Sequence, residues 1–598
     1  MKKYLIITVS LLVGATACNL LDTAPESTQS KDNFFRNETE LRLFSDAFYD
    51  QFDDRSGFYE YQDDHTIQLN LSKELRGGNT REVPATGGGW SFTMLRRINN
   101  LLENIDKCED EGVRAEYTAL AKFFRAYFYF EKVKRFGDVP YIDKVLSDTD
   151  PELQAPRDSR EYVIHKVLED LDAALEGLPA KKTVYRVSRY TALAFKANMC
   201  LYEGTYRKYH PQNTSSNQPW SSEYESSEQL LTMAYKAAEE LMESGVYHLA
   251  KDYRTLFAQI DADQDEMILA LKFEQSLSRK NNTFAYATMP TQGCPGLTKK
   301  FVDSFLMKDG SRFTDKQGWE TMQFIEEVAD RDPRLGMITR LPGYTYIGKP
   351  DEVLAPDYGS SVTGFQIAKF VMDATLPGVN RVDMSYNDLP FYRIAEMYLI
   401  YAEAKAELGI LEQKDLDISV NQLRKRVGMP DMSMADANAN PDPYLKSSEY
   451  GYSNPVLLSN ANLGVILEIR RERAVEMALE GRRWDDLMRW KEGKCIEQAM
   501  YGPYFPGSGK YDLTGDGAAD LVLYTGDDKP KDKVQVLKIG EKSGVILSEE
   551  TKGYVDNQQG IAHVFDESRD YLYPIPIEER QLNINLKQNP GWVDGLDY

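Results

Sequence analysis

Histidine and cysteine are scarce in this chain of 598 residues, which contains five of each. The histidines are scattered and no two cysteines lie close together, so neither residue type has the spacing of a metal site. The cysteines are Cys18, Cys108, Cys200, Cys294 and Cys495. We expect Cys108 and Cys200 to be lone buried thiols in helices. If Cys18 has a separate fate, the other four could pair in an oxidising compartment, and the sequence leaves their connectivity open.

Sequence motifs of catalysis are also missing. The chain has no His-Glu-x-x-His, no Gly-x-Ser-x-Gly, no phosphate-binding loop and no dinucleotide fingerprint. With 94 acidic residues, two carboxylates could lie at glycosidase distance by chance, but nothing in the sequence singles out such a pair. We therefore predict a protein that is not an enzyme and has no catalytic residues, with a secreted glycoside hydrolase on a helical scaffold as an alternative.

Positive charge is in deficit, since the formal net charge is −23. Phosphates would be repelled by such a chain, which argues against a nucleic-acid partner. Wide contact with an anionic bilayer is disfavoured for the same reason. Aromatic residues, in contrast, are plentiful: 37 Tyr, 25 Phe and 6 Trp. Most must lie in the core, but the tyrosine count leaves some for a surface that stacks on flat ligands.

The first 17 residues have the pattern of a secretion signal. Lys2 and Lys3 precede an apolar stretch over 4–13, and Ala-Thr-Ala at 15–17 is a small-residue cleavage site. Cys18 follows directly, so we predict a lipoprotein whose lipidated Cys18 becomes the N-terminus. The alternative is an ordinary secreted protein with a chance cysteine. Residues 18–31 are then a polar tether.

Two regions, 90–245 and 391–491, have the apolar spacing of paired helices. The helix at 393–408 carries apolar residues on two faces and ends at Gly409, a residue suited to a left-handed cap. Further helices are predicted around 416–427 and 463–478, and a first helix at 33–52. Gly481 breaks the pattern after 478, and Trp484, Leu487 and Met488 begin another apolar stripe. Helical hairpins in tandem cannot bury their apolar faces alone, so we expect them to stack into one scaffold.

The remaining segments are irregular. Residues 53–89 and 251–388 are rich in glycine, proline, aspartate and aromatic residues, and we expect both to build a ligand face on one side of the scaffold. Short strands are predicted at 267–273 and 520–525. Residues 501–598 form a loop-rich C-terminal part.

Three strings in this sequence resemble the RagB/SusD family. They are RIAEMYLIYAEAKAELG at 393–409, RRERAVEMALEGRRWDDLMRW at 470–490 and YLYPIPIEERQLNINLKQNPGW at 571–592. The resemblance extends over nearly the whole of 18–598 as a single SusD-like domain. It implies a mainly α fold, in which helical hairpins of a degenerate tetratricopeptide type form the scaffold and long irregular insertions decorate it.

The resemblance also implies a function. The family consists of lipid-anchored proteins that face the exterior on the bacterial outer membrane and capture nutrients, mostly glycans. The implied partner is a TonB-dependent transporter of the SusC/RagA type, over which the protein would act as a lid. Family members that bind peptides are the alternative within this class. An adaptor that binds only another protein is a further one.

Sugar binding needs aromatic faces for pyranose rings and polar groups for their hydroxyls. Candidates lie mostly in the irregular segments: Tyr59, Tyr61, Arg76, Arg81, Trp90, Asn282, Tyr286, Trp319, Tyr344 and Tyr346. Trp90 begins a core helix, which is a strong alternative role. Trp319 lies in a polar stretch and is the better candidate.

A possible structural calcium site is the string DLTGDGAAD at 512–520. Its oxygen donors would be Asp512, Thr514, Asp516 and Asp520, on a tight loop of the kind that hard cations need. The bidentate glutamate at the twelfth position of a calcium loop is absent, because Leu523 stands there. The alternative is an Asp/Gly turn that joins two strands. No other cofactor is predicted.

Arginines are concentrated at the end of the second helical region. They are Arg470, Arg471, Arg473, Arg482 and Arg483. We expect them to pair with Glu472, Glu476, Glu480 and Asp485 along the helices and with the opposing hairpin rather than to hold a ligand. Arg470 lies within the apolar stripe, so a buried ion pair or a helix-end contact is expected there.

Overall fold

The computed structural model describes residues 34–53 and 55–596 of the chain. The predicted secretion signal, Cys18 and the tether lie outside these residues. Within them, helices dominate over short strands, as the sequence predicts. None of the described helices is both long and apolar enough to cross a membrane.

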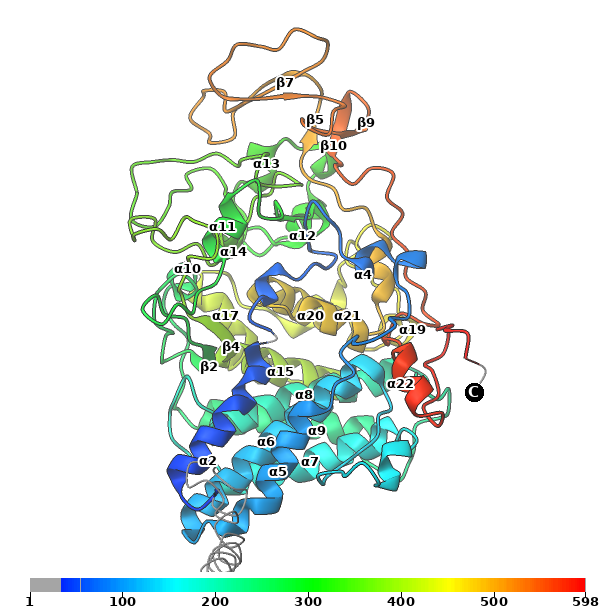
Figure 1. The fold of residues 1–598 in the computed structure, drawn as a ribbon. Helices are drawn as coiled ribbons and strands as arrows, with labels where there is room; N and C mark the ends of the chain where they lie inside the picture. Colours follow the sequence, from blue (N-terminus) through cyan, green and yellow to red (C-terminus); the bar gives the residue numbers. More distant parts are fainter. Residues whose placement is uncertain (1–33, 54, 597–598) are drawn as a thin grey trace, which may run out of the picture.

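Seven helices pack one against the next. Most of them form the lower part of the molecule in Figure 1, with α20 above the others. The seven helices are α5 (Thr93–Asn104), α6 (Glu111–Phe136), α7 (Arg160–Gly177), α8 (Arg189–Tyr209), α9 (Ser227–Glu243), α15 (Ile394–Leu408) and α20 (Leu463–Glu476). The insertion at 251–388 lies between α9 and α15 in sequence, yet these two helices are in contact. The helical hairpins therefore form one continuous, tetratricopeptide-like stack, which the insertion leaves and rejoins.

Local sequence signals explain where these helices begin and end. The side chain of Asp110 accepts a hydrogen bond from the backbone N–H of Val113 at the start of α6, and Ser226 forms a capping box at the start of α9. Gly409 ends α15 with a φ of 73°, in the left-handed conformation that its position in the sequence predicts.

The predicted first helix is broken into three short consecutive pieces. These are α2 (Glu38–Ser45), the 3-10 turn η2 (Asp46–Tyr49) and α3 (Asp50–Asp53). Aromatic contacts hold them along α6, because the Phe48 ring lies 5.7 Å from Phe124 and the Phe52 ring 5.1 Å from Tyr127. The predicted helix at 416–427 is likewise split, into α16 (Gln413–Asp417) and α17 (Val420–Arg426).

Shorter helices complete the second helical region. They are α18 (Met434–Ala439), α19 (Pro455–Leu458) and α21 (Arg483–Arg489). Gly481 separates α20 from α21 with a φ of 67°, which matches the predicted break. Helix α21 packs back on α8, so the middle of the stack and the end of this region are neighbours.

The two insertions meet above the helical stack (Figure 1). Strand β1 (Thr66–Ile67) of the first pairs antiparallel with β3 (Gly296–Leu297) of the second. Strand β2 (Met267–Leu271), which the sequence predicts, pairs with β4 (Leu389–Arg393) directly before α15. The other elements are short helices: α4 (Lys73–Arg76), α10 (Tyr253–Leu256), α11 (Thr283–Thr288), α12 (Lys299–Ser304), α13 (Phe324–Val328) and α14 (Pro333–Ile338).

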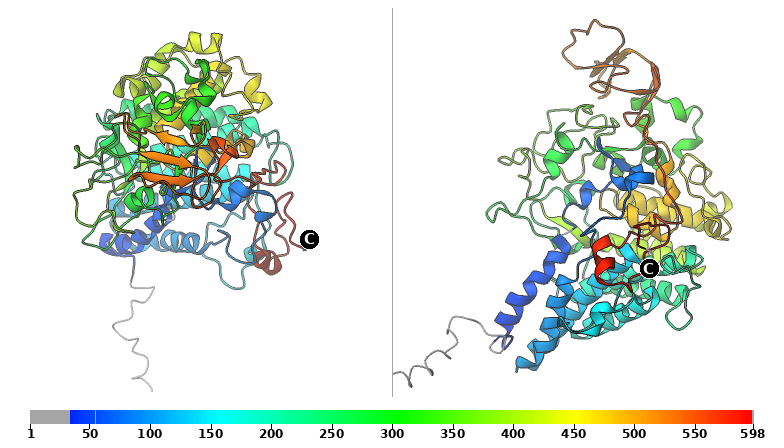
Figure 2. Two further views of the ribbon diagram at one scale, coloured as in Figure 1. Left: turned by 90° about the horizontal axis from the view of Figure 1, so that it is seen from above. Right: turned by 45° about the vertical axis from the view of Figure 1, so that its right-hand side comes forward.

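The C-terminal part first builds two small sheets at the far end of the insertions, seen from above in Figure 2. One contains β5 (Tyr504–Phe505), β10 (Lys552–Val555) and β9 (Leu547–Glu549). The other contains β6 (Gly509–Tyr511), β7 (Leu521–Tyr524) and β8 (Gln535–Lys538). The chain then returns to the helical stack and ends with α22 (Ile577–Leu582). Strand β7 matches the predicted strand at 520–525.

The clustered arginines are buried in ion pairs, as predicted, but most of their partners differ from those expected. Arg473 pairs with Asp486 and Glu396, Arg482 with Glu396, Arg483 with Asp64, and Arg471 with Asp442 and Glu468. Glu472, Glu476 and Glu480 instead pair with Arg334, Lys369, Arg393, Arg424 and Arg426. Tertiary contacts therefore set this network, rather than spacing along one helix.

Arg470 is fully buried, as its place in the apolar stripe predicts. Its nearest carboxylate oxygen, on Glu407, is 3.6 Å from a guanidinium nitrogen, and the guanidinium carbon lies 4.2 Å from the Trp490 ring centroid. The four described cysteines are buried free thiols, as expected for Cys108 and Cys200. Cys200 lies in α8 as predicted, whereas Cys108 directly follows a 3-10 turn and is not in a helix.

Candidate functional site

A cleft of about 540 Å³ opens where five parts of the chain meet. These parts are the first insertion, the second half of α6, Tyr202 of α8, the residues 481–488 around the start of α21, and the strap at 571–573 before α22. Its volume is in the range of known small-ligand sites. The lining residues that carry the argument are Arg55, Glu60, Tyr61, Glu74, Glu131, Lys132, Lys134, Arg135, Trp484, Asp485 and Tyr573.

Three aromatic side chains line the cleft without being fully buried. Tyr61 is 41% exposed, and Trp484 and Tyr573 are half-buried. Gly481 leaves room for the Tyr61 ring, because a Cβ built at Gly481 would lie 3.1 Å from Tyr61 Cδ2. Tyr573 is fixed on both sides: Arg135 stacks 3.8 Å from its ring centroid, and its hydroxyl donates a 3.0 Å hydrogen bond to Glu74.

The charged side chains of the cleft are paired with one another. Lys134 Nζ lies 2.8 Å from Asp485 Oδ2 and 3.0 Å from Glu131 Oε1. Arg55 lies 3.4 Å from the same Glu131 oxygen and 4.0 Å from Asp485 Oδ2. Burial by itself would raise the pKa of Asp485, but the nearby Lys134 and Arg55 outweigh it and lower that pKa below the ordinary aspartate value.

This arrangement suits a ligand with flat apolar faces and many hydroxyl groups. The rings of Tyr61 and Trp484 supply surfaces for C–H-bearing faces, and the charged groups supply strong donors and acceptors at fixed positions. Sugars have both kinds of surface. The cleft is therefore the best candidate for a glycan site in the described part of the chain.

Of the residues proposed from sequence, only Tyr61 lines this cleft. Arg76 is exposed at the end of α4 and is not part of the lining. Arg81 is buried, pairs with Asp570 at 3.1 Å and stacks on Tyr573 and Trp592, so it anchors the strap that carries Tyr573. Trp90 is 6% exposed, with its ring 4.8 Å from Phe136, and serves the core as its alternative role implied.

Three other sequence candidates come together, but inside the protein. The rings of Tyr59 and Tyr286 are 5.6 Å apart, and the backbone N–H of Asn282 donates to the Tyr59 hydroxyl at 3.1 Å. Each of the three is at most 9% exposed. In this structure these ring faces are covered by protein, because an insertion of this length needs a core of its own.

The last three candidates lie elsewhere in the second insertion. Tyr344 is buried and Tyr346 is half-buried, with ring centroids 6.0 Å apart, and Arg340 donates to the Tyr346 hydroxyl at 2.6 Å. Trp319 is half-buried and packs 5.4 Å from Tyr444. None of these three lines the cleft, so their role in ligand binding stays a prediction.

Sequence reasoning missed most of the cleft. The sequence predicts helix packing for Trp484 and ion pairing for Asp485, and it places Tyr573 in the string at 571–592 without a binding role. Arg55, Glu131 and Lys134 carried no signal. Trp484 was the one detectable candidate, because it follows a glycine break and stands in a strongly polar stretch.

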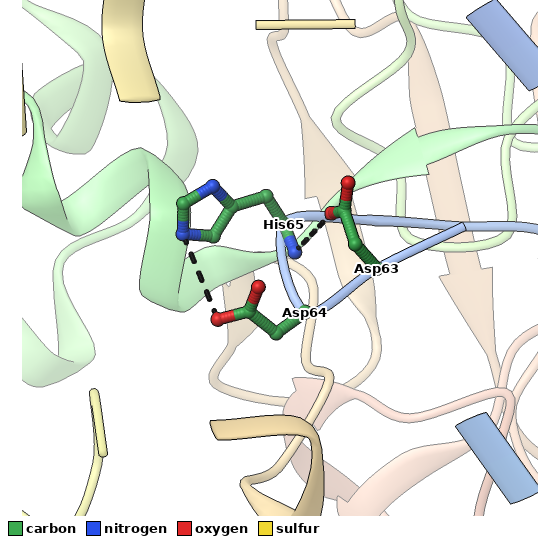
Figure 3. Close-up of side chains that lie close together, drawn as sticks. All are labelled: Asp63, Asp64 and His65. Atoms are coloured by element: carbon green, nitrogen blue, oxygen red, sulfur yellow. Dashed lines mark hydrogen bonds and ion pairs between the residues drawn. The ribbon is translucent and has the colours of Figure 1, made fainter. Parts of the chain in front are cut away.

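Asp63, Asp64 and His65 are close enough to suggest a metal site, the one such group among the described residues (Figure 3). Arg483 contacts both Asp64 oxygens at 2.8 Å, and Lys300 Nζ lies 2.8 Å from Oδ2. Asp63 Oδ1 accepts the backbone N–H groups of His65 and Thr66. The side-chain cations of Arg483 and Lys300 already neutralise the Asp64 carboxylate where a metal ion would bind. The group of Asp63, Asp64 and His65 therefore stabilises the fold.

The predicted calcium loop is a tight turn between β6 and β7. Asp512 accepts the backbone N–H groups of Thr514, Gly515 and Gly517, and Asp520 Oδ2 accepts those of Leu513 and Thr514. Asp516 accepts from Ala518. These contacts fit the alternative of an Asp/Gly turn. Calcium binding here stays a prediction, which a comparison of melting temperatures with and without calcium would test.

A model of the SusD family matches residues 265–592, more than half of the chain. The chain belongs to the SusD family. A second family model, described as "Starch-binding associating with outer membrane", matches residues 51–201. The first match contains the second helical region and all three strings, and the second match covers residues 90–201 of the first helical region, so the family resemblance of the three strings is confirmed.

Curated and solved SusD relatives agree with this membership. SusD-like protein P2 of Formosa agariphila is 24% identical over 523 residues, which cover 84% of this chain and 93% of that protein. The crystal structure of a SusD-like carbohydrate binding protein from Bacteroides fragilis has a TM-score of 0.63 at 20% identity, covering 93% of this chain and 100% of that one. A laminarin-binding SusD-like protein gives a TM-score of 0.53 at 18% identity, with coverages of 93% and 100%. These structures share the SusD fold.

Proposed function

We propose that this SusD-family protein is a non-catalytic binder of oligosaccharides or polysaccharides, and that the cleft is its glycan site. The observation that carries the proposal is the pairing of two accessible rings, Tyr61 and Trp484, with an ordered set of charged hydrogen-bonding groups. A carbohydrate binding protein and a laminarin-binding protein among the structural neighbours support the same ligand class.

We further propose that Cys18 is lipidated and that the protein works on the outer face of the outer membrane, where it delivers glycan to a TonB-dependent transporter of the SusC/RagA type. The description of the second family model supports association with the outer membrane. The anchor and the transporter come from the sequence pattern and the family resemblance. Co-purification with a transporter encoded nearby, and its loss in a Cys18→Ser variant, would test both.

The proposal includes that the protein does not cleave the glycan it binds. Two carboxylates of the cleft lining, Glu131 and Asp485, share the cation of Lys134. A general acid for glycoside cleavage needs a raised pKa, which disfavours Asp485, because Lys134 and Arg55 lower its pKa against the opposing effect of burial. Burial raises the pKa of Glu60, so Glu60 is the acid of the cleft on which an assay for cleavage bears. New reducing ends formed during incubation with polysaccharide would contradict a binding-only role.

Calorimetric titration with neutral oligosaccharides tests the cleft. Replacing a ring by alanine removes a stacking surface worth about 0.5–1.5 kcal/mol. We therefore expect Tyr61→Ala and Trp484→Ala each to weaken binding roughly two- to tenfold. Tyr524→Ala, on the remote strand β7, is the matched control and should bind like the unaltered protein.

The outcomes separate the alternatives. Unchanged affinity in both cleft variants would place the glycan site elsewhere. Heat with peptides instead of sugars would favour the peptide-binding alternative. No heat with either class would favour an adaptor that binds only protein.

A further inference from the structure

The cleft combines charges of both signs in equal number. Its described lining includes four basic and four acidic side chains: Arg55, Lys132, Lys134, Arg135, Glu60, Glu74, Glu131 and Asp485. The whole chain, in contrast, carries a net charge of −23. The cleft is therefore a locally balanced surface on an acidic protein.

Each of the four basic side chains is already engaged. Lys134 and Arg55 hold Glu131 and Asp485. Arg135 Nε donates a 2.7 Å hydrogen bond to the carbonyl of Gly88 and stacks on Tyr573. Lys132 donates to the carbonyl of Gly89 and lies 5.0 Å from the ring centroid of Phe128.

Two of the acidic side chains have no cation among their described contacts. Glu131 and Asp485 face cations, but Glu74 accepts from the neutral hydroxyl of Tyr573. Burial, followed by the charge of Asp383, raises the pKa of Glu60 above the ordinary glutamate value. A negatively charged ligand would thus meet these two acids, while every basic side chain of the cleft already has a partner that the ligand would have to share or displace.

We propose that the cleft selects uncharged glycans and rejects those with uronic acid or sulfate groups. This inference rests on the proposed function and adds the chemical class of the ligand. A neutral sugar can hydrogen-bond to the paired charges without separating them. An anionic sugar must either displace the present partners of Lys134, Arg135 or Lys132 or place its charge beside the acidic side chains of the cleft, and both choices cost affinity.

Binding to matched oligosaccharide pairs tests the inference. The protein would first be screened on a glycan array that contains neutral and acidic chains. It would then be titrated with hexamers of galactose and mannose and with the corresponding hexamers of galacturonic and mannuronic acid. We expect every bound glycan to be neutral, with at least tenfold weaker binding of its acidic counterpart. Tighter binding of an acidic hexamer or array member would overturn the inference while leaving glycan binding intact. Failure of all neutral and acidic glycans would overturn the proposed function as well.

A variant that removes two acidic charges from the cleft provides a second test. Glu131→Gln combined with Asp485→Asn removes both partners of Lys134 and Arg55 and keeps the side-chain shapes. We expect this variant to gain at least fivefold in affinity for acidic oligosaccharides, and the gain to shrink in high salt. Glu541→Gln, an exposed acid paired with Lys538 at 2.9 Å outside the cleft, is the matched control and should give no gain. Thermal melting would show whether the double variant is folded. If the folded double variant binds acidic glycans no more tightly than the unaltered protein, the role of these two carboxylates is contradicted.

Discussion

The buried carboxylate of Asp64 offers a sharp test of how the first insertion is held in place. Its side chain is fully buried, with Arg483 at 2.8 Å from each oxygen and Lys300 at 2.8 Å from one. Burial alone would raise the pKa of Asp64, but Arg483, His65 and Lys300 outweigh it and hold that pKa well below the ordinary value. Asp64 is therefore ionised, and it neutralises two buried cations.

Replacing Asp64 by asparagine keeps the shape and removes the charge. Breaking a buried ion pair from one side costs about 3–5 kcal/mol, because the partner charge is left buried without compensation. Asparagine can still accept one hydrogen bond from Arg483, so we expect a loss of about 3 kcal/mol in the free energy of unfolding. Urea unfolding followed by tryptophan fluorescence would measure it.

Asp63→Asn is the matched control, one residue away. Asp63 Oδ1 accepts two backbone N–H groups, from His65 at 2.8 Å and Thr66 at 3.0 Å, and an asparagine oxygen can accept both. We expect a loss of no more than about 1 kcal/mol, because the asparagine keeps both backbone contacts. Equal losses in the two variants, or a loss below about 1 kcal/mol for Asp64→Asn, would refute the reasoning. A fall in the unfolding midpoint of the unaltered protein in a chelator would instead indicate a metal at this group.

Two further predictions concern the same region. Gly481→Ala forces a side chain onto a residue with a φ of 67° and places its Cβ 2.9 Å from Phe58 Cβ and 3.1 Å from Tyr61 Cδ2. We expect the free energy of unfolding to fall by about 1–2 kcal/mol and glycan binding, measured by calorimetry, to weaken. Unchanged binding would mean that the position of Tyr61 is unimportant. Burial and the neighbouring Asp64 raise the pKa of Asp63 to about 7, so the folded state binds a proton that the unfolded chain has released between about pH 4 and 7. The contribution of Asp63 to stability therefore falls as pH rises through that window. The stability of Asp63→Asn relative to the unaltered protein should rise from pH 5 to pH 8, and a pH-independent difference in urea midpoints would contradict this.

The helical stack was predictable because the sequence features that determine each helix lie within that helix or directly beside it. Apolar spacing placed α15 and α20, and Gly409 and Gly481 marked helix ends that the structure reproduces. The short strands β2 and β7 could also be read from their apolar runs. The split between α16 and α17 was missed because the apolar spacing continues across residues 418–419.

The cleft was not predictable because it depends on distant parts of the chain. Arg55, Lys134, Asp485 and Tyr573 become neighbours only after the stack and the strap are in place. Composition was a poor guide in the insertions: Tyr59 and Tyr286 have the same character as Tyr61, but the first two are buried in the core of the insertions. The arginine partners were mispredicted for the same reason, since Arg473 reaches Glu396 on another helix.

A crystal structure of the protein with a bound neutral oligosaccharide tests the central claim most directly. We predict a sugar ring in the cleft, with one face against Tyr61 or Trp484 and hydroxyl groups within hydrogen-bonding distance of Arg55, Glu131, Lys134 or Asp485. A sugar bound only at another surface, with the cleft occupied by solvent, would contradict the account.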